Sequence, residues 1–139
     1  MARTVSDVMT KDPVSLKADA SVAEAAKAMS EFRIGSVVVM DKGKPLGIVT
    51  DRDIVVRAVA KGSDPTTTRL ADISTRDIAT VSPDQSVDEA IQVIKSRDVK
   101  RVVVMDDSRL EGIVSLGDLT SRGEGEDVQK DISRAEPNN

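Results

Sequence analysis

The sequence contains no cysteine and no histidine, and its aromatic residues amount to a single phenylalanine. Without these side chains, the common routes to nucleophilic and general acid–base catalysis at neutral pH are missing. Zinc and similar metals lack their preferred nitrogen and sulfur ligands, and single-stranded bases lack an aromatic platform on which to stack. The net charge of -4 also opposes binding to a polyanion. We therefore expect no enzyme, no metal site and no nucleic acid polymer as a partner.

Two further absences concern location. The N-terminal residues 1–7 are not followed by an apolar run, so we expect no signal peptide. No apolar stretch approaches the ~20 residues that a membrane-spanning helix needs. Together with the lack of cysteine, these features predict a cytoplasmic protein with no membrane partner. A length of 139 residues suits one compact domain or two small halves that share a core.

The sequence is internally repeated. Residues 5–54 align without a gap onto residues 70–119 at a constant offset of 65, with seventeen identical positions. Such agreement is far above chance for unrelated segments, so the chain is a tandem duplication. We place repeat 1 at residues 1–62, a linker at 63–68, repeat 2 at 69–122 and a polar tail at 123–139. The tail is expected to be mobile or to form a short surface helix.

One motif of the duplication combines a buried strand with polar side chains. Gly47-Ile48-Val49-Thr50-Asp51-Arg52-Asp53 returns as Gly112-Ile113-Val114-Ser115-Leu116-Gly117-Asp118. The glycine, the two β-branched residues, the hydroxyl and the final aspartate keep their spacing. The pattern predicts a strand that turns directly into a helix, with a hydroxyl and a carboxylate at the junction.

Local signals place the other elements of each repeat. We expect a short helical turn over residues 5–9, and an extended Asp12 because it precedes a proline. The patterns Ser21-x-x-Glu24 and Ser86-x-x-Glu89 are capping boxes that open helices. The apolar run at residues 37–40 and the strand at 46–49 are joined by a short turn, so they must be antiparallel.

After the first motif, a helix is expected to carry Ile54, Val55, Ala58 and Val59 on one face and to stop near Gly62. Each repeat then reads strand–helix–strand–strand–helix and has only a small core of its own. We therefore expect an α+β fold of two tandem βαββα repeats, with sheets packed about a pseudo-twofold axis. Two equivalent clefts would form where the repeats meet.

This duplicated pattern resembles a tandem pair of cystathionine β-synthase (CBS) domains, or Bateman module, of the small stand-alone prokaryotic type. The resemblance covers residue 4 to about residue 120. It implies a regulatory sensor that binds AMP, ADP, ATP or S-adenosylmethionine in one or both clefts and acts on an unidentified effector protein. No cofactor is required. It also implies a homodimer, for which Val55, Val56 and Val59 offer apolar surface.

The resemblance assigns a role to each candidate ligand-binding residue. The ribose hydroxyls would be bound by Asp53 and Asp118, and the ribose or phosphate by Thr50 and Ser115. The adenine would lie among apolar residues and backbone groups, and basic residues would meet phosphates. By position these are Val14, Ile34 and Gly35 in one site, and Ile78, Val99, Lys100 and Arg101 in the other.

A simpler interpretation stays open beside this one. Thr50-x-x-Asp53 and Ser115-x-x-Asp118 are also ordinary helix caps, worth roughly 1 kcal/mol each without any ligand. Lys100 and Arg101 fit equally well as solvated charges at a strand end. The alternative function is a dimeric CBS-pair interaction or stress-response protein that binds no nucleotide. Because the two copies differ around the motif, we do not expect the two clefts to bind alike.

Overall fold

The computed structural model describes residues 3–121, which form two compact units. One unit consists of residues 14–76, and the other combines residues 3–13 with residues 77–121. Each unit has its own core of buried apolar side chains, built on Val37, Val39 and Val49 in the first and on Val102, Val104 and Val114 in the second. The two units are called the 14–76 unit and the composite unit below.

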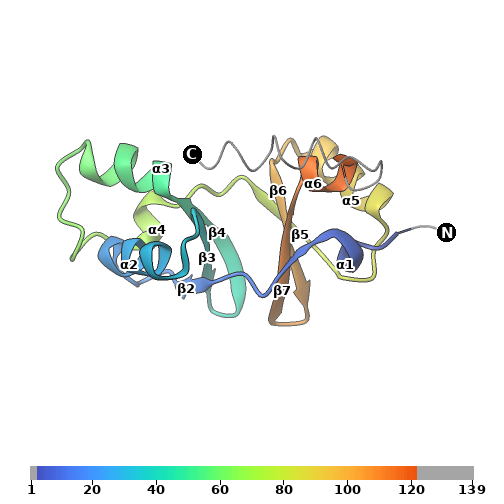
Figure 1. The fold of residues 1–139 in the computed structure, drawn as a ribbon, viewed down its shortest axis with the longest axis horizontal. Coiled ribbons are helices and arrows are strands. Elements are labelled where there is room, and N and C mark those ends of the chain that lie inside the picture. The colour runs from blue at the N-terminus through green and yellow to red at the C-terminus, as the bar shows by residue number, and fades with distance from the viewer. Residues whose placement is uncertain (1–2, 122–139) are drawn as a thin grey trace. The chain divides into compact units, whose positions relative to one another are not determined.

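The 14–76 unit is a three-stranded sheet with helices, in the strand order β2-β3-β4 (Figure 1). Strands β2 and β3 are parallel, whereas β3 and β4 form an antiparallel hairpin. Its elements are β2 (Ser15–Lys17), α2 (Val22–Phe32), β3 (Ser36–Asp41), β4 (Lys44–Thr50), α3 (Asp51–Asp53), the π-helix η1 (Ile54–Val59) and α4 (Leu70–Ile73).

The composite unit is a four-stranded sheet in the order β1-β7-β6-β5. Here β5 and β6 are parallel, and β6 and β7 form the antiparallel hairpin. Its elements are α1 (Val5–Val8), β1 (Thr10–Lys11), β5 (Ile78–Val81), α5 (Val87–Arg97), β6 (Arg101–Asp106), β7 (Arg109–Ser115) and α6 (Leu116–Ser121).

The chain start contributes to the composite unit, although it belongs to repeat 1 in sequence. Strand β1 pairs with β7, so the N-terminal segment runs beside the hairpin of repeat 2 (Figure 1). Val5 and Val8 have no exposed surface and join the core of that unit. The matching segment of repeat 2 makes the same exchange, since Thr75 bridges to Ile48 and α4 packs in the 14–76 unit. The compact units therefore differ from the sequence repeats by this exchange of leading segments.

The strongest local signals of the sequence are confirmed. Ser21 and Glu24 form reciprocal hydrogen bonds at the start of α2, as Ser86 and Glu89 do at the start of α5. Both hairpins are antiparallel, as the short turns required. The α+β class with two repeats is also confirmed. The polar tail predicted for residues 123–139 lies outside the described residues.

Two local predictions are wrong. The helix after the first motif becomes a π-helix over Ile54–Val59, in which the Ala60 N–H donates to the Val55 carbonyl at 2.8 Å. A π-helix has a wider turn than an α-helix, so Ala58 is buried while Val55 and Val59 are 57% and 62% exposed instead of sharing its face. Asp12 has a φ of 51° rather than an extended conformation, a region that aspartate tolerates better than most residues.

Among residues 3–121, we find no helix with both the length and the apolar character needed to cross a bilayer.

Candidate functional site

The first strand-to-helix junction is held by a reciprocal pair of hydrogen bonds. Thr50 ends β4 in an extended conformation and caps α3. The Thr50 backbone N–H donates to Asp53 Oδ2 at 2.9 Å, and the Asp53 N–H donates to Thr50 Oγ1 at 3.1 Å. This is a capping box with aspartate in the place that glutamate or glutamine usually occupies. The helix-capping interpretation of this motif is therefore correct, although capping does not account for every contact of Asp53.

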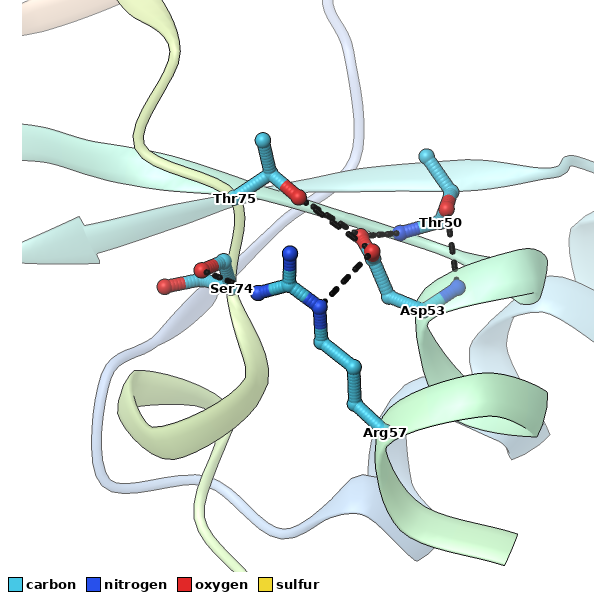
Figure 2. Close-up of polar contacts among 5 residues, drawn as sticks. All are labelled: Thr50, Asp53, Arg57, Ser74 and Thr75. Carbon is cyan, nitrogen blue, oxygen red and sulfur yellow. Dashed lines mark hydrogen bonds and ion pairs between the residues drawn. The ribbon is translucent and has the colours of Figure 1, made fainter. Parts of the chain in front are cut away.

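The carboxylate of Asp53 has further partners within the same unit (Figure 2). Thr75 Oγ1 donates to it, at 3.2 Å from Oδ1 and 3.4 Å from Oδ2. Arg57 Nε lies 3.7 Å from Oδ1, and Arg57 Nη1 also reaches the Ser74 carbonyl at 3.5 Å. The Asp53 side chain is only 13% exposed. The protein itself thus engages most of the acceptor capacity of this carboxylate.

Neither Thr75 nor Arg57 was predicted as a neighbour of Asp53. A signal for each was present in the sequence. Thr75 is one of the seventeen identical repeat positions, matching Thr10, and Arg57 follows Asp53 by four residues, which places it one helical turn away. What the sequence could not show is that the segment before β5 pairs with β4 and so brings Thr75 to the junction.

The glycine of the motif is explained by this pairing. Thr75 and Ile48 exchange backbone hydrogen bonds of 2.8 and 2.9 Å directly beside Gly47. A Cβ atom at Gly47 would lie 2.5 Å from the Thr75 carbonyl oxygen, which is closer than real contacts allow. In the composite unit, a Cβ at Gly112 would meet the Met9 side chain and the Thr10 carbonyl oxygen. The glycine therefore permits the close approach of a neighbouring segment, whatever else the motif does.

The remaining candidates of the first site lie at the same end of its sheet. Gly35 accepts a hydrogen bond from the Asp51 N–H at 3.0 Å, so it is next to the junction. Val14 accepts from the Val38 N–H at 2.9 Å, just before β2 begins. Val14 and Ile34 are partly buried and pack against the core of the unit. The structure brings these residues to the end of the sheet where β4 stops.

The second junction has the same capping box with fewer added contacts. The Ser115 N–H donates to Asp118 Oδ2 at 3.1 Å, and the Asp118 N–H donates to Ser115 Oγ at 3.3 Å. Within residues 3–121, the Asp118 carboxylate has no other hydrogen bond and no ion pair. It is therefore less engaged than Asp53, although the two aspartates occupy equivalent positions.

The other candidates of the second site also gather at one end of a sheet. Arg101 is the first residue of β6 and is in register with both Ile78 and Ser115 on the flanking strands. Val99 packs against the core, and Lys100 is exposed. Over the described part of the chain, neither basic side chain forms an ion pair. Their contact with a phosphate stays a prediction.

The part of the chain from residue 3 to residue 121 contains no group of three or more histidine, cysteine or acidic residues that could hold a metal ion.

Comparison with known proteins identifies the repeats. A family model described as "CBS domain" matches residues 5–59 and again residues 70–125. The chain belongs to the CBS domain family. The resemblance inferred from the duplicated motif is thereby confirmed, and the two matched ranges make the protein a tandem CBS pair.

Relatives of this CBS protein include small proteins of the same extent. The "CBS domain-containing protein YhcV" of Bacillus subtilis is 31% identical over 116 residues, which cover 84% of this chain and 82% of that protein. The crystal structure of "Hypoxic Response Protein I (HRPI) with two coordinated zinc ions" has a TM-score of 0.68 at 31% identity, and covers 86% of this chain and 98% of that one. A "hexameric CBS-CP12 protein from bloom-forming cyanobacteria" has a TM-score of 0.70 at 26% identity, with coverage of 97% and 84%.

Membership sets the general function of the chain. CBS pairs are regulatory modules, and stand-alone CBS proteins are generally regulatory rather than enzymes. The zinc ions in the hypoxic response protein are a property of that protein. This chain has no histidine and no cysteine with which to supply nitrogen or sulfur ligands.

Proposed function

We propose that this CBS pair is a sensor that binds an adenosine-containing ligand, namely AMP, ADP, ATP or S-adenosylmethionine, and transmits its presence to an effector protein. The proposed primary site is the junction of Ser115 and Asp118 in the composite unit. The observation that carries this choice is the Asp118 carboxylate, which accepts one hydrogen bond within its own cap and has no other partner among residues 3–121.

The chemistry of Asp118 suits a ribose. An ionised carboxylate offers about four acceptor positions on two oxygens, and the bond from the Ser115 N–H uses only one of them. Two neighbouring hydroxyl groups, as on a ribose, could donate to the remaining positions through charge-assisted hydrogen bonds. The side chain is partly buried, so these bonds would be less exposed to competition from water than on an open surface.

The basic residues beside this junction suit a phosphate. Arg101 lies directly opposite Ser115 in the sheet, and Lys100 precedes it. Neither is neutralised by an acidic side chain within the described residues. The equivalent positions of repeat 1 hold Gly35 and Ser36, which carry no charge. A phosphate is therefore better accommodated at the second junction than at the first.

The first junction is the weaker candidate. A ribose at Asp53 would compete with the Thr75 hydroxyl and with Arg57, both of which already contact the carboxylate. Displacing the Thr75 hydroxyl forfeits a hydrogen bond of the folded protein, so part of the binding free energy is lost. We infer that the first site binds the ligand more weakly than the second.

A matched pair of variants tests this proposal. In Asp118→Glu, the capping box is preserved, because glutamate is a favoured residue at this position and Glu89 already fills it in α5. The added methylene displaces the carboxylate from the ribose. We expect affinity for the best of the four ligands, measured by calorimetry, to fall at least about tenfold, which corresponds to ~1.4 kcal/mol. The control Asp53→Glu should lower it less.

Ligand identity is tested by a thermal shift screen on the parent protein. A ligand at 100 times its dissociation constant should add about 2.7 kcal/mol to the free energy of unfolding. If none of AMP, ADP, ATP and S-adenosylmethionine raises the melting temperature, the junctions are helix caps only. Equal loss of affinity in the two glutamate variants would instead remove the preference for the second site.

We also infer that two copies of the chain associate through the π-helix. Val55, Val56 and Val59 are 57%, 45% and 62% exposed, an unusual concentration of apolar surface on one short element. A hollow of about 310 Å³ lies at its start, lined by Asp51, Arg52, Val55 and Val56. An exposed apolar patch suits a twofold homodimer, in which the same surface of the two copies is in contact.

A further inference from the structure

A second hollow lies at the opposite end of the sheet from Thr50, in the 14–76 unit. Its volume is about 520 Å³, within the range of small-molecule sites. Three basic residues line it, namely Lys17, Lys42 and Arg69, and its apolar lining includes Ala18, Met40 and Ala71. We propose that this hollow binds a small phosphorylated molecule that also carries hydroxyl groups. It is called the basic pocket below.

The three basic residues come from three different elements. Lys17 ends β2, Lys42 lies in the hairpin turn between β3 and β4, and Arg69 is the residue that precedes α4. Segments distant in sequence thus converge on one concave surface. A patch of this kind differs from a run of neighbouring lysines along one solvated helix face.

The backbone beneath the pocket is firmly connected. The Ala18 N–H donates to the Met40 carbonyl at 2.9 Å, and the Ala71 N–H donates to the Ala18 carbonyl at 3.0 Å. Lys17 is in register with Met40 in the parallel pair of β2 and β3. These bonds tie the strand end, the hairpin and the segment before α4 together. The positions from which the basic side chains project are therefore fixed before any ligand arrives.

The charges in the pocket are not neutralised internally. Asp19 and Asp41 also line it, yet across the described residues none of the basic side chains forms an ion pair with an acidic group. Three cations and two carboxylates leave a surplus of one positive charge. A phosphate group would accept hydrogen bonds from the cations, while the carboxylates could accept from hydroxyl groups on the same molecule.

The duplication supplies an internal comparison. At the equivalent positions of the composite unit, Lys17, Lys42 and Arg69 are replaced by Ser82, Asp107 and Thr4. The acidic pair is retained there, as Asp84 and Asp106. The same fold therefore forms without any of the basic residues, so they are not needed to build it. Their joint presence in the 14–76 unit is what points to an anionic ligand.

The basic pocket is separate from the adenosine site proposed above. β4 has seven residues between the hairpin and the Thr50 junction, so the two ends of the strand are roughly 20 Å apart. The proposed primary adenosine site lies in the other unit. The basic pocket could thus be occupied whether or not the adenosine proposal is correct.

The test is an NMR titration of the full chain with inorganic pyrophosphate and with glucose 6-phosphate, each at about 0.15 M salt so that weak surface attraction is screened. We expect saturable shifts of the backbone amides of Lys42, Gly43 and Ala71. The amides of Ser115 and Asp118 are followed separately, because Arg101 lies opposite Ser115 and could attract a phosphate there as well. Shifts at these two amides report the adenosine site, and shifts at Lys42, Gly43 and Ala71 report the basic pocket. Glucose 6-phosphate should bind more tightly than pyrophosphate if Asp19 and Asp41 accept from its hydroxyl groups.

A triple variant tests whether the three basic residues bind the ligand. In it, Lys17→Ser, Lys42→Asp and Arg69→Thr replace each basic residue by the one at the equivalent position of the composite unit. Each replacement has a precedent in the same fold, since Asp107 has a φ of 59° like the 53° of Lys42, and Thr4 precedes α1 as Arg69 precedes α4. Loss of a charged hydrogen-bond partner weakens binding roughly tenfold or more. We therefore expect the triple variant to lose at least about a hundredfold in affinity.

A charge-matched control uses exposed residues outside the pocket, as Lys27→Ser, Lys61→Asp and Arg97→Thr together. This variant should bind both probes within about twofold of the parent, because local contacts rather than net charge hold the ligand. If the control loses as much affinity as the pocket variant, the attraction is non-specific and the proposal fails. It also fails if neither probe produces saturable shifts at the pocket amides.

Discussion

Asp53 and Asp118 show how much a single carboxylate depends on its neighbours. Both occupy the final position of the same motif, and both accept a hydrogen bond from the hydroxyl residue that caps the helix. Asp53 also meets Thr75 and Arg57, whereas Asp118 has no further partner within residues 3–121. The Asp53 carboxylate is thus part of the internal hydrogen-bonding of the 14–76 unit, whereas the Asp118 carboxylate keeps acceptor positions available for a ligand.

Gly47 gives a prediction at the residue scale. In Gly47→Ala, the new Cβ would lie 2.5 Å from the Thr75 carbonyl oxygen, which is part of the backbone and cannot rotate away. We expect a loss of about 1–3 kcal/mol in the free energy of unfolding, as for other overpacked sites. Urea denaturation measures this change.

The control is Gly117→Ala, where a Cβ would meet only Ser115 Oγ at 3.8 Å. Gly117 lies inside α6, so alanine should stabilise the protein by up to about 1 kcal/mol through its higher helix propensity. If both alanine variants behave alike, the close approach of Thr75 is not what requires the glycine at position 47.

At the scale of the element, the parts that could be predicted are those fixed by neighbouring residues. The capping boxes of α2 and α5 and the two hairpins depend on side chains within a few positions, and the sequence shows these directly. The duplicated motif also located both junctions. The π-helix at Ile54–Val59 and the positive φ of Asp12 lie where segments distant in sequence contact them, since Arg57 reaches the Ser74 carbonyl and the Asp12 N–H donates to the Glu111 carbonyl at 3.1 Å. Contacts of this kind leave no pattern among neighbouring residues of the sequence, so they could not be predicted from it.

The cap of α1 predicts a dependence on pH. The Thr4 backbone N–H donates to Asp7 Oδ2 at 2.9 Å, and this bond, together with the Thr4 hydroxyl, lowers the pKa of Asp7 below its usual 3.8. Because the folded pKa is depressed, the stabilisation is present above pH 3.8 and is lost as the pH falls through the lower folded pKa. The Thr4 amide resonance, followed by NMR, should therefore titrate below pH 3.8.

The variant Asp7→Asn should abolish this titration, because an amide carries no charge over the range. Asp72, which occupies the position of Asp7 in repeat 2, provides the control. Its helix α4 begins after Arg69, which has no hydroxyl and makes no side-chain cap. Asp72→Asn should leave the Thr4 titration intact. A Thr4 amide that titrates unchanged in Asp7→Asn would contradict the assignment.

For the whole molecule, we predict that the composite unit, but not the 14–76 unit, depends on the N-terminal segment for its stability. A chain that lacks residues 1–13 would lose β1 from one edge of the four-stranded sheet and expose core that Val5 and Val8 cover. Burial of these two side chains contributes roughly 1.5–3 kcal/mol each. We expect amide hydrogen exchange to speed up throughout residues 77–121.

Residues 14–76 serve as the control region in the same experiment. Their sheet and core contain no part of the removed segment, so their protection should change little. Equal loss of protection in both units would show that the chain unfolds as one cooperative block, and unchanged protection in residues 77–121 would show that the N-terminal segment is dispensable.

The proposed dimer makes a second prediction at this scale. Val55→Lys places a charge in the exposed valine patch of the π-helix and should convert a dimer to a monomer of 14.8 kDa in sedimentation experiments. Phe32→Lys is the matched control, because Phe32 is also 57% exposed but lies at the end of α2. It should leave the mass unchanged. A parent protein that sediments only as a 14.8 kDa species would rule out the dimer.

The exchange of the leading segments also sets an order of events during synthesis. A ribosome delivers residues 14–76 as one continuous stretch, so that unit can fold while the rest of the chain is still being made. The segment with α1 and β1 precedes residues 14–76 in the chain but has no sheet to join until β7 has been translated. At about 5–20 residues per second, that wait lasts roughly 5 to 20 seconds. The segment with α1 and β1 is thus made well before the strands that complete its sheet, and Val5 and Val8 must remain uncovered until then.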